Sequence, residues 1–302
     1  MRWIAVRIAA LLLRVLARPR FQRLNTALFT LSIRGLGMLN YRNLEESGET
    51  YFLKKVLPCY YSSGTATRAV VLDVGANVGN YSRTILKVAP GAQVYCFEPH
   101  PVNVSLLESA LGTSVTVVPV AVGSAPGTLE LYDYEGTTGS SHASLHKEVF
   151  EQILQRPHHS QCVPVTTIDE FVEQRGIEAI ALLKVDVEGH EYAVLQGAAR
   201  VIRERKVDLV QFEFNEMNVI TRVFLADFFA LLPGFAFYRL LPVGWIPITD
   251  RPIENVFAFQ NIVAVRVAAP VFRVFAPHHD ERWSGSIRVN EAGGDEERTR
   301  TR

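Results

Sequence analysis

Short apolar runs alternate with stretches of helical periodicity between residues 69 and 267. Residues 69–74 form an almost continuous apolar run, which is typical of a buried strand, and residues 81–89 repeat apolar side chains at helical spacing. The same patterns predict strands at 93–97, 115–120, 128–134, 182–187, 207–214, 234–241 and 262–267, and helices at 102–111, 167–175, 191–205 and 221–231. Strands that alternate with helices favour an α/β fold whose mostly parallel sheet is covered on both faces.

The two ends of the chain depart from this pattern. Residues 19–65 are helical in character but broken by Gly35, Gly37 and Gly48. From His278 onward the chain carries mixed charges and no apolar periodicity, which is typical of a disordered tail. The sequence therefore predicts a basic, amphipathic helical segment at 1–65, an α/β domain at 66–270 and a tail at 271–302.

Charge is divided unequally along the chain. The 31 basic and 31 acidic residues cancel, yet residues 1–44 contain eight arginines, no lysine and no acid. The remainder, with 23 basic and 31 acidic residues, stands at −8. A nucleic-acid-binding protein with a basic surface is therefore disfavoured, and we expect no nucleic-acid partner. Three widely spaced cysteines predict ordinary thiols in a reducing, cytoplasmic compartment.

The first residues can be interpreted in three ways. Residues 3–16 predict an apolar helix in which Arg7, Arg14 and Arg18 share one stripe. The longest uncharged run there, 8–13, is too short to span a bilayer, and the arginines interrupt any signal-peptide core. The first interpretation is a helix that packs on the domain, and the second is a helix that lies on anionic lipid. The third is an organellar transit peptide. The second interpretation predicts a peripheral membrane contact through residues 1–24.

A glycine-containing loop follows the first predicted strand. It runs from Asp73 to Tyr81 (DVGANVGNY), and its glycines allow a tight turn and close approach of a ligand. Glu98 ends the next strand, where an acid can accept the hydroxyl groups of a ribose. The loop is neither the G-x-G-x-x-G pattern of dinucleotide sites nor a P-loop, so NAD and a bound triphosphate are both disfavoured.

The loop resembles the D-x-G-x-N-x-G variant of class I S-adenosylmethionine-dependent methyltransferases. Further segments are similar to the FkbM-type branch of that family, namely 34–41 (RGLGMLNY), 97–99 (FEP), 121–123 (AVG), 182–191 (LLKVDVEGHE) and 194–198 (VLQGA). The resemblance extends from about residue 33 to residue 266 and implies a Rossmann-like, doubly wound sheet of seven strands. It also implies S-adenosylmethionine (SAM) as cofactor and, often, O-methylation of a sugar or natural-product hydroxyl.

The resemblance assigns a set of cofactor-binding residues. In this family the glycines wrap the methionine end of SAM and the acid after the second strand holds the ribose. The positions that match are Asp73, Gly75, Asn77, Gly79, Tyr81, Glu98, Pro99, Ala121 and Asp186. SAM is a sulfonium cation without a pyrophosphate, so acidic and carbonyl groups suit its pocket better than a basic cradle.

Methyl transfer to an alcohol also needs a group that takes the hydroxyl proton. His190, Glu188 and Glu213 follow the fourth and fifth core strands, whose carboxyl ends line the ligand-binding edge of such a sheet. We expect these three residues to be catalytic, with His190 as the base. Mg²⁺ held by Asp186, Glu213 and Asn215 is a less favoured alternative, since carboxylate and amide oxygens suit that ion.

Two further segments are candidates for acceptor binding. The hydroxyl-rich loop 139–145 either closes over the acceptor or simply connects strands. Trp245, in the predicted loop 242–247, is interpreted as an exposed platform for sugar stacking or as ordinary packing.

Three functions remain open from the sequence. The first is O-methylation of a sugar or glycan-type acceptor, and the second is methylation of a polyketide or other small natural product. The third is a non-catalytic interaction module that keeps the cofactor-binding fold.

Overall fold

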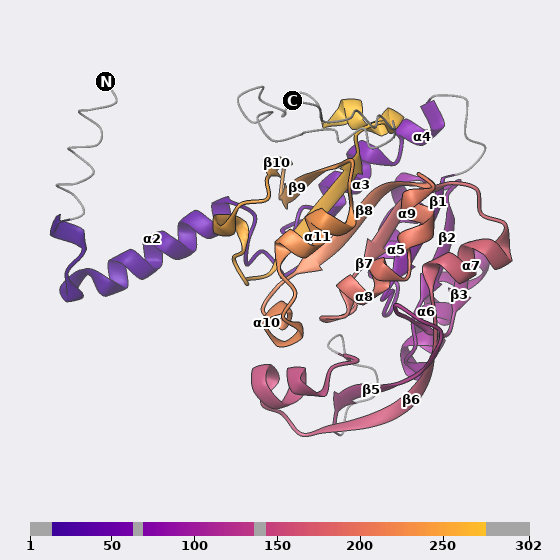
Figure 1. The fold of residues 1–302 in the computed structure, drawn as a ribbon, viewed down its shortest axis with the longest axis horizontal. Coiled ribbons are helices and arrows are strands. Elements are labelled where there is room, and N and C mark those ends of the chain that lie inside the picture. The colour runs from indigo at the N-terminus through magenta and orange to yellow at the C-terminus, as the bar shows by residue number, and fades with distance from the viewer. Residues whose placement is uncertain (1–13, 63–68, 136–142, 276–302) are drawn as a thin grey trace, which may run out of the picture.

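The structure, a computed structural model, describes residues 14–62, 69–135 and 143–275. Its centre is an eight-stranded sheet in the order β10-β9-β11-β8-β7-β1-β2-β3 (Figure 1). The strands are β1 (Val70–Val74), β2 (Gln93–Phe97), β3 (Thr116–Val118), β7 (Ile180–Val185), β8 (Val207–Phe214), β9 (Phe235–Leu241), β10 (Gly244–Ile248) and β11 (Gln260–Arg266). From β3 to β8 neighbouring strands are parallel, and from β8 to β10 they are antiparallel. The predicted mostly parallel α/β fold is confirmed.

The sheet has one strand more than the seven expected, because residues 244–248 form the edge strand β10 instead of a loop. Gly244 pairs with Leu241 of β9 across a tight turn. Trp245 is only 5% exposed, and its ring centroid lies 4.5 Å from that of Phe275. The prediction of an exposed stacking platform at Trp245 is therefore wrong, because the indole belongs to the core.

Helices cover both faces of the sheet, as the apolar runs predicted. Along β1 successive side chains point to opposite faces, so Leu72 and Val74 join one core cluster and Val71 joins the other. The first cluster contains side chains of α7 (Ile168–Arg175), α8 (Glu191–Gln196), α9 (Ala199–Arg203) and α11 (Leu225–Leu231). The second contains side chains of α3 (Glu49–Val56), α5 (Asn80–Val88) and α6 (Pro101–Leu111).

Two predicted helices have different bounds in the structure. The helix expected at 191–205 divides into α8 and α9 at Gly197, where a Cβ would lie 2.0 Å from the carbonyl oxygen of Gly123. The helix expected at 221–231 begins only at Leu225, because α10 (Met217–Thr221) precedes it as a separate turn. The first break follows from tertiary packing, which local periodicity does not record. The second has a local cause, since the Asp227 side chain accepts a hydrogen bond from the backbone N–H of Phe224 and caps the start of α11.

A second, three-stranded sheet lies beyond the carboxyl ends of the main sheet (Figure 1). Its order is β4-β6-β5, with β4 (Ala121–Val122), β5 (Gly127–Tyr134) and β6 (His158–Thr166). His158 and His159 begin β6 and pair with β5, and no strand was predicted there from the sequence. A π-helical turn at Val149–Leu154 precedes β6.

The N-terminal part contains α2 (Gln22–Gly35), α3 and α4 (Cys59–Ser62), in agreement with the broken helical pattern. Short 3-10 turns lie at Pro19–Phe21, Gly112–Ser114, Pro252–Glu254 and Pro270–Val274. Within residues 14–62, 69–135 and 143–275, no helix has the length and apolar character needed to cross a bilayer. Most of the helix predicted at 3–16 lies outside the described residues, as does the start of the candidate acceptor loop at 139–145. Residues 276–302 of the predicted tail also lie outside them, whereas Val271 and Phe275 are buried in the second core cluster, so the prediction that the tail begins at residue 271 is wrong.

Candidate active site

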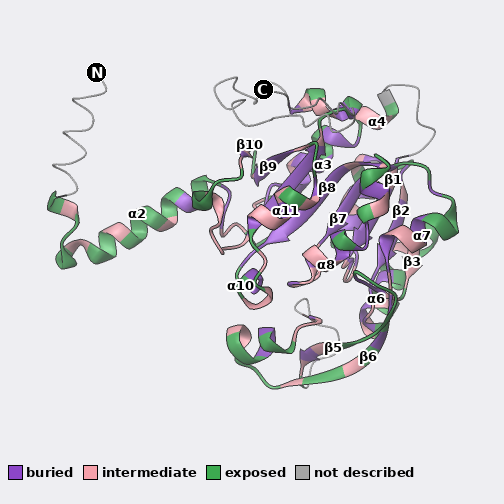
Figure 2. Cartoon of the chain, viewed as in Figure 1, coloured by how far each residue is buried: buried purple, intermediate pink, exposed green. Residues whose placement is uncertain are grey.

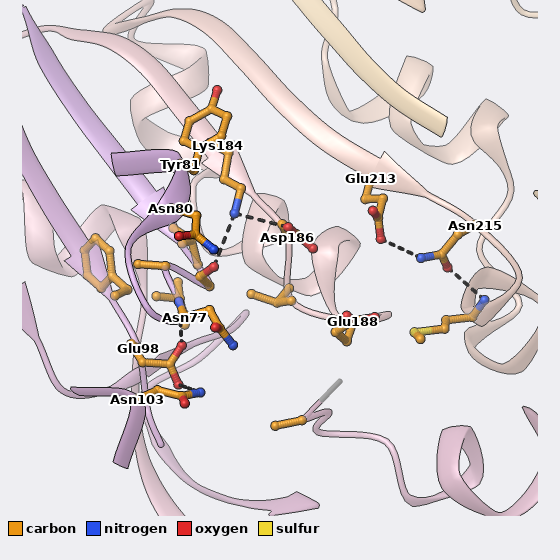
Figure 3. Close-up of a pocket in the computed structure, with 18 of the residues that line it drawn as sticks. Asn77, Asn80, Tyr81, Glu98, Asn103, Lys184, Asp186, Glu188, Glu213 and Asn215 are labelled. Atoms are coloured by element: carbon orange, nitrogen blue, oxygen red, sulfur yellow. Dashed lines mark hydrogen bonds and ion pairs between the residues drawn. The ribbon is translucent and has the colours of Figure 1, made fainter. Parts of the chain in front are cut away.

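A cavity of about 710 Å³ opens where the parallel strands end. Loops after β1, β2, β7 and β8 form its floor, and the small second sheet lies across from them (Figures 1 and 3). Strand order reverses between β1 and β7, and open α/β sheets bind ligands in the crevice at such a switch point. Seven of the nine predicted cofactor-binding residues line the cavity: Gly75, Asn77, Tyr81, Glu98, Pro99, Ala121 and Asp186.

The glycine loop is shaped by two left-handed residues that line the cavity. Gly75 has φ +79°, and a Cβ there would lie 1.8 Å from the carbonyl oxygen of Asp186, so only glycine allows the β1 and β7 loops to meet. Asn77 also has a positive φ, of 49°. Gly79, in contrast, does not line the cavity. A Cβ at Gly79 would lie 2.6 Å from the Leu107 side chain, so this glycine serves the packing of α6.

Glu98 connects the first loop to the second. Its Oε2 accepts a hydrogen bond from the backbone N–H of Asn77 at 2.9 Å, and its Oε1 accepts one from that of His100 at 2.9 Å. Burial raises the pKa of this carboxyl group above its usual value, and the backbone donors oppose the shift. The Asn103 side-chain amide donates a third hydrogen bond, to Oε1 at 3.5 Å, so about one of the four acceptor positions of the Glu98 carboxylate is left for a hydroxyl group in the cavity.

Lys184 is a buried cation in the cavity lining, and it was not among the predicted site residues. Its Nζ lies 3.3 Å from Oδ1 of Asp73 and 3.2 Å from Oδ2 of Asp186, and it donates to the carbonyl oxygen of Gly75 at 3.2 Å (Figure 3). Burial opposes the charge, but attraction by Asp186, Asp73 and Glu49 raises the pKa of Lys184 above its usual value. This cluster fixes the β1 loop against the β7 loop.

Asp73 lies below the cavity and does not line it. Its Oδ2 accepts a hydrogen bond from Ser82 of α5 at 2.6 Å, and its other oxygen faces Lys184. The structure therefore gives Asp73 a positioning role for Lys184 and α5. Direct contact with a cofactor, as the resemblance implied, remains a prediction.

Glu49 enters the cavity from α3 and was also missed. Its carboxylate accepts hydrogen bonds from Ser47 at 2.6 Å and from Gln211 at 2.8 Å. Burial raises its pKa to about 7. Gln211 in turn accepts a hydrogen bond from the hydroxyl of Tyr81 at 2.5 Å. No motif marks Glu49, because 162 residues separate it from Gln211.

Glu213 lies at the opposite end of the cavity from Glu98 (Figure 3). Its Oε2 accepts a hydrogen bond from the side-chain amide of Asn215 at 2.7 Å, and Asn215 is held by the backbone N–H of Met217. Burial, followed by repulsion from Asp186 and Glu188, raises the pKa of Glu213 well above its usual value. A carboxylate with a raised pKa is a stronger base than an ordinary carboxylate, which suits it to accept a proton.

Of the three predicted catalytic residues, the structure brings Glu188 and Glu213 to the cavity. His190 is not among the lining residues: its Nδ1 lies 3.2 Å from Nε2 of His146, and it packs near Gly123. Burial and the neighbouring His146 lower the pKa of His190 to about 4, so its ring is a weak base. The predicted role of His190 stays untested, and the geometry favours Glu213.

The alternative Mg²⁺ ligands, Asp186, Glu213 and Asn215, all line the cavity. Asp186 is paired with Lys184, however, and the Asn215 amide nitrogen points to Glu213. In the described part of the chain, no three histidine, cysteine, aspartate or glutamate side chains are grouped as a metal would require. The donor set thus fits ion pairing and amide hydrogen bonding better than metal ligation.

The fold and the cavity define the class of protein. It is an α/β protein with a nucleotide-type cofactor site at the switch point of its parallel sheet. The sequence profile described as the methyltransferase FkbM domain matches residues 73–231. The chain belongs to the FkbM methyltransferase family and is a SAM-dependent methyltransferase. The predicted family and enzyme class are confirmed, which argues against a non-catalytic interaction module.

Three relatives illustrate the range of this family. The 2-O-methyltransferase NoeI of Sinorhizobium fredii is 24% identical over 58% of this chain and 75% of its own length. The 31-O-demethyl-FK506 methyltransferase FkbM of Streptomyces tacrolimicus is 31% identical over 50% and 69%. The hexuronic acid methyltransferase AglP of Haloferax volcanii is 27% identical over 47% and 55%.

Replacing Glu98 by alanine is expected to weaken SAM binding by at least about tenfold, because a charged acceptor and the anchor of the Asn77 loop are both lost. Isothermal titration calorimetry measures the change. Glu108→Ala, on the exposed face of α6, is the matched control and should bind SAM like the parent. A dissociation constant for Glu98→Ala within about twofold of the parent would contradict this assignment.

Proposed function

We propose that the protein transfers a methyl group from SAM to a hydroxyl group of a sugar or glycan-type acceptor. The observation that carries the proposal is Glu213, a buried carboxylate with a raised pKa at the end of the cavity opposite the glycine loop. The names of two relatives specify O-methylation, and that of a third specifies a hexuronic acid. A hydroxyl acceptor requires a proton acceptor at such a place.

The cofactor end of the cavity fits SAM. Gly75 leaves space at the loop, Glu98 offers an acceptor position for a ribose hydroxyl, and Asp186 supplies negative charge. When bound, SAM supplies a methyl group on a positively charged sulfur. We propose that these three residues hold it.

The acceptor end orients a hydroxyl group and removes its proton. The side-chain amide of Asn215 donates a hydrogen bond to the Glu213 carboxylate at 2.7 Å, so the orientation of this carboxylate in the cavity is fixed. The acceptor oxygen would gain the methyl group as the sulfur–methyl bond breaks and leaves S-adenosylhomocysteine, and Glu213 would take the proton of the acceptor hydroxyl. Orientation of this kind lowers the barrier by several kcal/mol.

An aromatic pair at the cavity supports a sugar acceptor. Tyr41 and Phe259 both line it, with ring centroids 5.8 Å apart in an edge-to-face arrangement, and Tyr41 is 61% exposed. The C–H face of a pyranose packs on such a ring while its hydroxyl groups reach polar side chains. We propose that Tyr41 is the stacking platform, a role for which Trp245 was one candidate.

The charge of the lining selects among sugars. Acids outnumber bases: Glu49, Glu98, Asp186, Glu188, Glu213 and Glu216 against Arg42 and Lys184. Lys184 is already paired, so an anionic acceptor would meet net repulsion. We therefore propose an uncharged or amino sugar in preference to a uronic acid, and no nucleic-acid acceptor.

Tyr41→Ala is expected to raise the acceptor KM about tenfold, with kcat and SAM affinity changed much less, because stacking is lost and the reacting groups stay in place. Steady-state release of S-adenosylhomocysteine on a panel of neutral, amino and uronic glycosides measures it. Tyr41→Trp should retain activity, and Tyr61→Ala, outside the cavity lining, is the matched control. An unchanged KM for Tyr41→Ala, or preferential turnover of uronic glycosides, would contradict the proposal.

The alternative acceptor is a small natural product. The name of the FkbM relative, a 31-O-demethyl-FK506 methyltransferase, supports it. Turnover of a hydroxylated polyketide in the same assay, with no turnover of any glycoside, would favour this second function. A peripheral membrane contact of the N-terminal part also remains a proposal, supported by its acid-free, arginine-rich sequence. The cytoplasmic location remains a proposal as well, supported by the free thiols of Cys59, Cys96 and Cys162, which are typical of a reducing compartment.

A further inference from the structure

Helix α2 projects from the body of the molecule (Figures 1 and 2). It contains 14 residues, a length of about 21 Å, and Ile33 is its one buried residue. Its base is fixed, since the Leu39 N–H donates to the carbonyl oxygen of Phe259 at 2.8 Å and Met38 forms a β-bridge with Gln260. A helix so anchored at one end presents the rest of its surface outward.

Large apolar side chains cover much of that surface. Leu24, Leu28 and Leu31 follow the four- and three-residue spacing that places them on one face of the helix, and Leu31 is 71% exposed. Phe29 is 60% exposed on another side. A contiguous exposed apolar face of this kind marks an interaction surface.

The charges on and around this helix all have one sign. Five arginines precede Gly35 in the described residues, and the first acid of the chain is Glu45. Arg23 and Arg34 lie together along one side of the leucine face on a helical wheel, where long basic side chains reach past an apolar face to charged groups. The complement of such a helix is an apolar layer covered by negative charge.

We propose that α2 lies on an anionic phospholipid bilayer, with Leu24, Leu28 and Leu31 in the lipid and the arginines at the phosphate groups. This inference moves the membrane contact from residues 1–24 to Gln22–Gly35. The residues that follow α2, including Leu39 and Tyr41, line the cavity, so docking places the cavity beside the membrane surface. If the proposed function holds, a glycan carried on a lipid is then the favoured acceptor.

Vesicle flotation of the full-length protein tests the docking. The probes are vesicles of phosphatidylcholine with about one third phosphatidylglycerol, and vesicles of phosphatidylcholine alone. The parent should float with the anionic vesicles and much less with the neutral ones. Leu24→Glu/Leu28→Glu should reduce binding at least about tenfold, because the leucine face is lost.

Thr26→Glu/Thr30→Glu is the matched control, since it adds the same charge to the same helix away from the leucine face. It should reduce binding clearly less than the leucine variant. No flotation of the parent, or equal loss in both variants, would overturn the proposal. A parent that sediments as a dimer and becomes monomeric in Leu24→Glu/Leu28→Glu would also overturn it and assign the face to a second copy. SAM binding by calorimetry confirms that both variants fold, and flotation is independent of methyl transfer.

Discussion

Glu213→Gln is expected to lower kcat for acceptor methylation by about 100- to 10,000-fold, the usual contribution of a general base. Glutamine keeps the size of the side chain and an acceptor for the Asn215 amide, but it does not take up a proton at neutral pH. SAM affinity should change little, because Glu213 lies at the other end of the cavity from Glu98. The rate of S-adenosylhomocysteine release under saturating SAM measures the loss.

The pH dependence gives this prediction a second readout. The raised pKa of Glu213 means that the ionised base is present above that pKa, so kcat/KM of the parent should fall as pH decreases through it. For stability the sign is opposite: a raised carboxyl pKa favours the folded state at low pH, and this contribution is lost as pH rises through the folded pKa. Glu213→Gln should therefore be at least as stable as the parent above neutral pH.

The same assay distinguishes Glu213 from His190. If Glu213 is the base, Glu213→Gln lowers turnover far more than His190→Ala does. The residual activity of Glu213→Gln then no longer falls as pH decreases. Equal or greater loss in His190→Ala would instead support the role predicted for His190. A Glu213→Gln enzyme with parental kcat would rule out the proposed base.

Lys184→Met is expected to lower the free energy of unfolding by about 3–5 kcal/mol, because removal of one partner leaves the buried Asp73 carboxylate without a counter-charge. Asp73 and Asp186 lie within 3.3 Å of Lys184, and Asp73 is fully buried. Equilibrium urea denaturation measures the change. SAM affinity should fall as well, since the Gly75 loop loses a hydrogen bond that holds it.

Two variants make the Lys184 prediction specific. Lys206→Met removes a partly exposed lysine that is 3.1 Å from Glu204, and a surface pair of this kind contributes under about 1 kcal/mol. Adding Asp73→Asn to Lys184→Met should restore part of the stability, because it removes one of the unpaired charges. A loss for Lys184→Met no larger than that for Lys206→Met would contradict a structural role for the buried cluster.

Much of the fold could be predicted from the sequence, because strand and helix periodicity are local properties. The strands at 93–97 and 207–214 have the predicted bounds, and the glycine loop lies between β1 and α5 as expected. The hydrophobic pattern did not predict β10 or β6 as strands, because pairing with a neighbouring strand outweighs weak local signals there. The hydrophobic pattern also predicted one helix in place of α8 and α9, because the close approach of Gly197 to Gly123 is a tertiary contact.

By itself, then, the sequence determined the parallel sheet, the class of cofactor loop and the acid that follows β2. These features depend on residue types at short spacings along one strand–loop–helix unit. Only the tertiary structure decided that Glu49 and Tyr41 reach the cavity from the N-terminal part, that Lys184 joins the β1 and β7 loops, and that His190 turns toward His146. Such contacts join residues distant in the chain, and packing of the two core clusters, rather than local periodicity, brings them together.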